Sequence, residues 1–325
     1  MSFQTNISIP KSLFNITYNS QILSLGSCFS VNIGNRLNAL KYNIIQNPCG
    51  ITFNPLSILS CIKRCIYQNT LLHDDMIKSG NLFAHSEFHG SFNNIDPLEY
   101  LKKANLSIKN SHHFIKDVDH VLITLGTAFV YKLKSNGQAV NNCHKLSSEL
   151  FDRELLSTDE IEQALSESIS MIRAFVKKDV KFILALSPVR HLKDGMIQNQ
   201  KNKATCLLAI HNICTQLEQV EYFPSYEILL DELRDYRFYN EDMVHPTPKA
   251  INHVFNYFEA WCLDPDESDR RKEILKIQNS LNHRPLHPED PAYADFKSKL
   301  MADMTAMENK FTSLSFAREK ESLLR

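Results

Sequence analysis

The stretch from Ile22 to Ser30 constrains the fold more than any other part of the chain, because one glycine joins an apolar run to a helical pattern. Apolar residues before Gly26 suit a buried strand. After it, apolar residues recur at spacings of three and four, as on one helix face: Phe29, Ile33, Leu37 and Leu40. Such a turn holds Ser27 and Cys28 at the carboxyl edge of a sheet, beside the N–H groups of a helix start. One segment therefore offers a nucleophile and an anion site.

The remaining pattern alternates strands with helices. Buried strands are predicted over 121–126, 182–186 and 220–223, and helices over 55–66, 161–176, 207–217 and 248–261. Strands separated by helices form a mainly parallel sheet that is covered on both faces, so the predicted fold class is α/β. Residues 68–118 are polar without a long period, and we expect loops there, with short strands near 82–85 and 86–89.

The chain divides into a domain over residues 1–263 and a C-terminal helical extension over 264–325. A charged region begins at Asp264, followed by a helix over 267–281, a turn between Pro285 and Pro291, and a polar helix. The extension has too few large apolar residues for its own core. It is expected to pack on the main domain, to pair with a partner as in a homo-oligomer, or to fray.

Composition limits the function classes. Lys and Arg total 36 against 37 Asp and Glu, so the net charge of −1 argues against nucleic acid and anionic membranes. No apolar run approaches the roughly 20 residues of a membrane span, and no secretory leader is apparent, so a cytoplasmic protein is expected. Eight cysteines without a Cys-x-x-Cys pair indicate reduced thiols. The histidine pairs at 85/89 and 112/113 do not suggest a ligand set, and neither a metal nor a cofactor is expected.

Asp242 and His245 form a second constellation, just before a helix that Thr247 and Pro248 open. Three residues apart on a loop, a carboxylate and an imidazole can hydrogen bond, which fixes the tautomer of the base. An Asp-x-x-His pair is common in structural roles. Together with a nucleophile at a strand-to-helix turn, it favours catalysis.

These residues resemble the GSCFA family, a bacterial group, through Leu25-Gly26-Ser27-Cys28-Phe29, with Ser30 where the family usually has Ala. The resemblance covers about residues 20–260. Further matching segments are Asn47–Ile51, Leu125–Ala128, Asn142–Lys145, Ser187–His191 and Asp242–Pro246. The family is similar to SGNH hydrolases, which implies a three-layer, flavodoxin-like fold and esterase or acyltransferase activity.

The SGNH pattern assigns roles residue by residue. It implies that Cys28 is the nucleophile, that Gly50 contributes an oxyanion donor, and that Asp242 and His245 complete a triad. Ala128 stands where the pattern has asparagine, so a donor is missing or comes from Asn47, Asn142 or His144. Losing one donor typically costs about 2.7–4 kcal/mol of transition-state stabilisation.

Other candidates have two interpretations each. Ser27 is either the nucleophile or a cap of the helix. Arg190 binds either an anionic substrate group or a buried carboxylate. His144 and His191 are either substrate contacts or ordinary loop histidines. Gly26 and Thr127 complete the candidate substrate and oxyanion positions.

The sequence thus predicts an acyl-ester hydrolase or O-acyltransferase for a small-molecule, glycan or lipid ester. Cys28 would attack the acyl carbonyl, and His245 would take its proton. A helix start and a histidine are expected to lower the pKa of the Cys28 thiol. The alternative is a module that keeps the scaffold and binds a glycan or acyl group without turnover. A third possibility is an interaction protein that works through its C-terminal helices.

Overall fold

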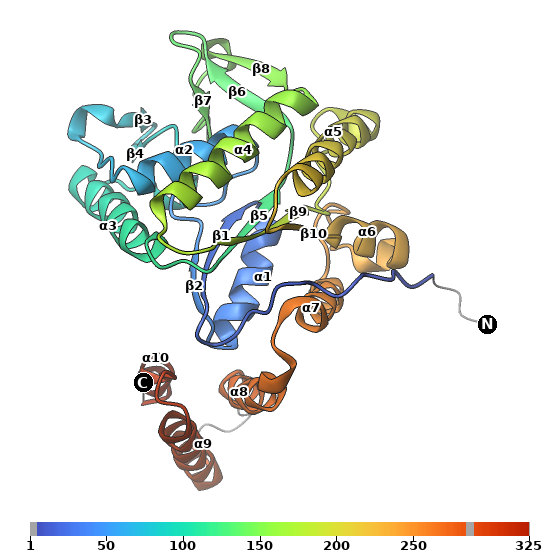
Figure 1. The fold of residues 1–325 in the computed structure, drawn as a ribbon. Coiled ribbons are helices and arrows are strands. Elements are labelled where there is room, and N and C mark those ends of the chain that lie inside the picture. Colours follow the sequence, from blue (N-terminus) through green and yellow to red (C-terminus); the bar gives the residue numbers. More distant parts are fainter. Residues whose placement is uncertain (1–4, 284–288, 325) are drawn as a thin grey trace.

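Five parallel strands form the centre of the molecule, in a computed structural model that describes residues 5–283 and 289–324 (Figure 1). The strands are β1 (Gln21–Gly26), β2 (Asn43–Gln46), β5 (His120–Leu125), β9 (Lys181–Leu186) and β10 (Val220–Phe223). Their order across the sheet is β10-β9-β5-β1-β2, and every neighbouring pair is parallel. The predicted α/β fold with a parallel sheet is confirmed.

The strand order reverses between β1 and β5. Numbered by their place in the chain, the five strands run 2-1-3-4-5, which is the order of flavodoxin-like sheets. In such sheets the connections leave β1 and its neighbour toward opposite faces, and a crevice opens outside the carboxyl ends of these two strands. Residues that directly follow β1 and β5 are therefore placed to contact a ligand.

Helices cover both faces of the sheet (Figure 1). One face carries α2 (Pro55–Ile66), α3 (Pro97–Ile115), α4 (Thr158–Phe175) and α5 (Gly195–Gln216), and the other carries α1 (Cys28–Ala39) and α7 (Pro248–Cys262). The fully buried strand β5 shows why both faces of the sheet are covered. Its residues Val121, Ile123 and Leu125 pack in one core, whereas Leu122 packs in the other, since successive side chains of a strand point to opposite faces.

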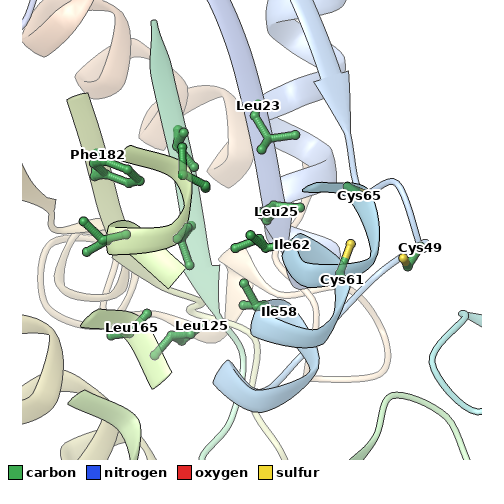
Figure 2. Close-up of a cluster of buried hydrophobic side chains, with 14 of the residues drawn as sticks. Leu23, Leu25, Cys49, Ile58, Cys61, Ile62, Cys65, Leu125, Leu165 and Phe182 are labelled. Carbon is green, nitrogen blue, oxygen red and sulfur yellow. The ribbon is translucent and has the colours of Figure 1, made fainter. Parts of the chain in front are cut away.

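The larger core lies between the sheet and α2. Figure 2 shows Leu23 and Leu25 of β1 facing Ile58 and Ile62 of α2. On the far side of α2, three buried residues gather in the same core: Cys49, Cys61 and Cys65. All eight cysteines are free thiols, as predicted. The two helical cysteines are thus small core residues.

The expectation of loops throughout 68–118 was wrong, because α3 occupies 19 of these residues. Its buried positions are Tyr100, Ala104, Ile108, Ser111 and Ile115. Alanine and serine make this stripe weak in a hydrophobicity pattern, although the spacing is helical. Of the two expected strands, only β4 (Leu82–Ala84) forms, paired with β3 (Ile77–Ser79); residues 86–89 are a turn.

A small antiparallel sheet, which the sequence did not indicate, follows β5. It contains β6 (Phe129–Leu133), β7 (Ala139–Val140) and β8 (Phe151–Leu155), in the order β7-β6-β8. Because β6 begins four residues after β5 ends, this sheet stands beside the carboxyl edge of the central sheet. Its aromatic residues become available to line a site there.

The C-terminal extension packs on the α1 and α7 face. Its helices are α8 (Ser268–Leu281), α9 (Pro291–Lys310) and α10 (Ala317–Leu324), and part of the expected proline turn lies outside the described residues. Buried Ile274 and Met304 belong to the same core as Tyr42 and Trp261 of the main domain. Arg271 is also buried and donates to Glu259 Oε1 at 2.7 Å and to the Tyr42 hydroxyl at 3.3 Å. Of the three expected arrangements, the structure has the first.

Within residues 5–283 and 289–324, no helix is both long and apolar enough to cross a lipid bilayer.

Candidate active site

The turn between β1 and α1 is built on Gly26. Its φ of 135° lies in a region that favours glycine, and a Cβ at this position would come within 2.2 Å of the Thr124 carbonyl oxygen. Its amide donates to Asn47 Oδ1 at 2.8 Å. Gly26 therefore allows β1 to run close beside β5 and still turn sharply into α1.

The two residues after this turn have different environments. Ser27 occupies the N-cap position of α1, but its side chain makes no capping hydrogen bond, and its buried Oγ has no partner among the described residues. The capping interpretation of this hydroxyl is therefore wrong. Cys28 is the first residue of α1 and is partly exposed. Its sulfur is the more accessible of the two candidate nucleophiles.

A pocket of about 350 Å³ opens at the carboxyl ends of β1, β5 and β9. Ser27 and Cys28 come from the β1 turn, Gly126 and Thr127 follow β5, and the segment from Ser187 to His191 follows β9. The other residues that line the pocket come from the start of α2, the antiparallel sheet and the loop before α7: Phe53, Asn54, Phe129, Tyr131, Val140, Asn141, Arg153, Val244 and His245. Distant segments thus meet where the strand order reverses.

Asp242 and His245 form the expected hydrogen-bonded pair. His245 Nδ1 lies 2.7 Å from Asp242 Oδ2, and the amides of Val244 and His245 both donate to Asp242 Oδ1 at 2.9 Å. These bonds lower the pKa of the Asp242 carboxyl to about 2, with the His245 amide as the largest cause. The carboxylate is therefore ionised at neutral pH and holds the proton of His245 on Nδ1, which leaves Nε2 as a proton acceptor.

His245 lines the same pocket as Cys28, but no hydrogen bond joins the two side chains in the structure. The His245 side chain is about half exposed (49%), and its loop is anchored by backbone bonds of Asn240 to His245 and of Met243 to Asn240. In structures without substrate, catalytic hydrogen bonds are often long and tighten only in the complex.

The pKa of the Cys28 thiol is raised, not lowered as the sequence predicted. Burial is the largest cause, since it disfavours the charged thiolate. The Lys203 ammonium and the backbone amides of Cys28 and Phe29 act in the opposite direction without overcoming it. His245 does not contribute. The Cys28 side chain is therefore a protonated thiol at rest.

Lys203, which the sequence analysis did not single out, bonds to two residues of the pocket lining without lining the pocket itself. It belongs to α5 and is only 1% exposed, and its Nζ donates to the carbonyl oxygens of Gly126 and Ser187 at 2.7 Å each. No carboxylate pairs with it among the described residues. Burial lowers its pKa to about 8. A signal existed: counting back from Ile210 in steps of three and four places Lys203 on the buried helix face.

Asn54 is a second missed residue. It caps α2 through its Oδ1, which accepts from the Ser57 amide at 2.9 Å. Asn54 also lines the pocket, and its Nδ2 makes no hydrogen bond with any described residue. The capping bond thus leaves one side-chain donor available to the pocket.

Ala128 stands where the SGNH pattern has asparagine, and an asparagine from another element, Asn202, binds its backbone. Buried Asn202 of α5 accepts from the Ala128 amide at 2.5 Å and from the Thr127 hydroxyl at 3.1 Å. The Thr127 amide donates to the Phe53 carbonyl at 3.0 Å. Thr127 lines the pocket, but its donors are engaged, and the turn after β5 therefore offers no free amide at these two residues.

Several predicted oxyanion residues lie outside the pocket. Asn47 is buried and holds the Gly26 amide, and the Gly50 amide donates to the Asn47 carbonyl at 2.7 Å. His144 is buried, with Nε2 2.9 Å from the His85 carbonyl, and Asn142 Oδ1 accepts from the His144 amide at 2.8 Å. Gly26 is absent from the lining as well. These five residues shape loops behind the site.

His191, which follows β9, and Arg153 of β8 are neighbours in the pocket lining, with Arg153 Nη2 3.3 Å from His191 Nε2. The His191 amide donates to Asn199 Oδ1 at 2.8 Å, and burial lowers the pKa of its imidazole. Arg153 lies 3.9 Å from the centre of the Phe129 ring and forms a two-point ion pair with Asp194. Neither the His191 nor the Arg153 side chain makes a hydrogen bond with Cys28.

The described residues contain no group of three or more His, Cys, Asp or Glu side chains arranged to hold a metal ion. The side chains that line the pocket include the Cys28 thiol, the imidazole of the Asp242–His245 pair, and the guanidinium groups of Arg153 and Arg190.

Comparison with known proteins gives two matches. The model of the GSCFA family matches residues 21–258, which contain every residue of the pocket. The model of the GSCFA domain protein C-terminal domain matches residues 274–325, which lie in the helical extension. No curated protein matches the chain.

Proposed function

The chain belongs to the GSCFA family, and from this premise and the pocket we propose that it transfers acyl groups from esters through a thioester on Cys28. The observation that supports this proposal most is the hydrogen bond between Asp242 and His245. His245 lines the same pocket as Cys28, the first residue of α1. A nucleophile, a base and a residue that orients the base form the minimum of covalent acyl transfer. The likeness of the sequence motifs to SGNH hydrolases supports the same chemistry.

The first step forms the acyl-enzyme. His245 Nε2 takes the proton from the Cys28 thiol while sulfur bonds to the acyl carbon, and the carbonyl oxygen becomes an oxyanion. The carbonyl then reforms, the ester C–O bond breaks, and His245 returns the proton to the departing alkoxide. Asp242 keeps the imidazole oriented and stabilises the imidazolium.

The second step releases the acyl group. An acceptor hydroxyl gives its proton to His245 Nε2 and attacks the thioester carbonyl, and the C–S bond breaks. The proton then passes to the Cys28 sulfur, which restores the thiol. Water as acceptor makes the protein a hydrolase, and a sugar or lipid hydroxyl makes it an O-acyltransferase.

In this proposal, four groups stabilise the negative charge that develops in these steps. The Cys28 and Phe29 amides occupy the first turn of α1, where backbone N–H groups lack helical partners. Asn54 Nδ2 replaces the side-chain donor that Ala128 cannot supply. Lys203 provides positive charge beneath the thiolate as it forms. Such prearranged charge matters most for a thiol whose resting form is neutral.

Ester cleavage tests this proposal. With p-nitrophenyl acetate, His245→Ala should abolish release of p-nitrophenol above the Cys28→Ala background, and Asp242→Asn should slow release less. His253→Ala is the matched control. His253 lies on α7, its Nε2 is 2.6 Å from Glu232 Oε1, and it does not line the pocket. Release that is unaffected by His245→Ala would contradict the proposal.

The alternative is a binding module without turnover. Two observations favour it: no hydrogen bond links Cys28 with His245, and burial raises the pKa of the thiol. In that case wild-type protein would cleave no ester faster than the Cys28→Ala variant.

A further inference from the structure

Arg190 is the cation of the pocket without a carboxylate partner among the described residues. Its Nη1 donates to the Met243 carbonyl at 3.3 Å, and its guanidinium lies 4.2 Å from the centre of the Tyr239 ring and 5.2 Å from that of Tyr236. These neighbours place the guanidinium over aromatic rings but leave its charge uncompensated. Of the two interpretations from the sequence, the buried carboxylate is absent.

Arg153 of β8 also lines the pocket, but its charge is compensated. Both of its terminal nitrogens bind Asp194, at 2.7 and 2.5 Å. Among residues 5–283 and 289–324, no aspartate or glutamate lines the pocket, and Asp242 is engaged with His245. The pocket therefore presents an excess of positive charge, and this excess is located at Arg190.

The rest of the wall is apolar, with Phe53, Phe129, Val140, Val189 and Val244. A neutral acyl group suits this surface, whereas Arg190 has the planar fork of donors that recognises carboxylates and phosphates. We infer that Arg190 binds an anionic, oxygen-bearing group of the substrate, either a carboxylate or a phosphate. The substrate class is thus a charged ester rather than a neutral lipid or glycan ester.

This inference takes the role of the pocket from the proposed function, but its test requires no turnover. Alkylation of Cys28 by iodoacetate and by iodoacetamide uses the same thiolate, so the ratio of the two rates cancels the thiolate fraction. The ratio reports the preference of the pocket for an anion. Rates are measured on the full chain by mass spectrometry of the Cys28 peptide, and free cysteine gives the reference ratio.

The ratio of iodoacetate to iodoacetamide should exceed that of free cysteine, and Arg190→Gln should lower it by about threefold to tenfold. Arg190→Lys keeps the charge and should retain most of the preference. Arg237→Gln is the control for charge alone, because Arg237 lies on the neighbouring loop, pairs with Asp235 and does not line the pocket. An unchanged ratio in Arg190→Gln, or an equal fall in Arg237→Gln, would overturn the inference.

Protection from iodoacetamide separates the two anions. Inorganic phosphate or acetate is added at constant ionic strength, and slower Cys28 alkylation in wild type but not in Arg190→Gln shows binding at Arg190. Protection by phosphate alone indicates a phosphate-bearing substrate, and protection by acetate indicates a carboxylate. Protection that persists in Arg190→Gln would contradict the assignment. If the anion site exists and no ester is cleaved, the proposed chemistry fails while the inference stands.

Discussion

The Cys28 sulfur lies among groups that come from three different elements. The first turn of α1 supplies two amides, α5 supplies the Lys203 ammonium, and the loop before α7 supplies His245. Burial opposes ionisation of the thiol, and the amides and the ammonium favour it, with burial prevailing. The proposed mechanism therefore assigns a base to this thiol, and the energetic cost of the buried Lys203 charge can be measured.

Lys203 should make stability depend on pH in a defined direction. Burial lowers its folded pKa to about 8, against about 10.4 in an unfolded chain, so the unfolded state binds more protons between these values. The free energy of unfolding should therefore rise with pH through this window. Relative to Lys203→Met, wild type should gain about 2 kcal/mol between about pH 7 and 9.5 in urea titrations.

Exposed Lys201 on the same helix provides the control, since Lys201→Met should give a curve parallel to wild type. If the curve of unfolding free energy against pH for Lys203→Met were also parallel to that of wild type, the buried ammonium would not be destabilised in the folded protein.

Asn54→Asp separates the two functions of Asn54. Aspartate caps a helix as well as asparagine does, so α2 and the melting temperature should be unaffected. The side-chain donor is lost, and acylation by p-nitrophenyl acetate should slow by about 10²–10³-fold, as for other oxyanion donors. The reciprocal exchange Asp96→Asn at the cap of α3, outside the pocket, should change neither. Acylation at the wild-type rate in Asn54→Asp would remove this residue from the mechanism.

At the scale of elements, the turn from β1 to α1 depends on the absence of a side chain at Gly26. Gly26→Ala would drive a methyl group into the Thr124 carbonyl and should cost more than about 4 kcal/mol of stability in urea unfolding. Gly80→Ala, also at positive φ but in open space, should cost only about 1 kcal/mol. Similar losses at both glycines would mean that the close approach of β1 to β5 is not what requires Gly26.

The elements that the sequence predicted are those with strong periodicity. Strands β1, β5, β9 and β10 and the helices α1, α2, α4 and α7 follow apolar spacing, and the Asp242–His245 bond follows from two residues on one short loop. In contrast, α3 buries alanine and serine, and the sheet β7-β6-β8 has short strands with mixed exposure. Their order comes from tertiary contacts that a local pattern does not record.

The same limit applies to the site. Motif likeness placed Asn47, Gly50, Asn142 and His144 at the oxyanion, but these residues bond to the backbone of neighbouring loops. Lys203 was hidden because a charged residue on a helix normally faces solvent. Helical spacing places Lys203 on the buried face of α5, but its bonds to the Gly126 and Ser187 carbonyls depend on how α5 packs against the strand ends.

At the scale of the whole molecule, the extension completes the core on the α1 and α7 face. Truncation after Leu263 should leave a folded α/β domain, because the sheet and the larger core lie before this residue. It should lower the melting temperature in circular dichroism and promote self-association in gel filtration, since apolar surface around Tyr42 and Trp261 is uncovered. Complete unfolding would show that the extension is required for the domain. Homo-oligomer formation through these helices stays a prediction.

The position of the acyl group on the treated protein decides whether Cys28 is the nucleophile. Wild-type protein is treated with p-nitrophenyl acetate, quenched in acid and digested, and the acetylated peptide is sequenced by mass spectrometry. The account predicts an acetyl group on Cys28 that hydroxylamine removes, that persists in Ser27→Ala and that is absent in Cys28→Ala. An acetyl group on Ser27, or one that survives Cys28→Ala elsewhere in the pocket, would contradict Cys28 as the nucleophile.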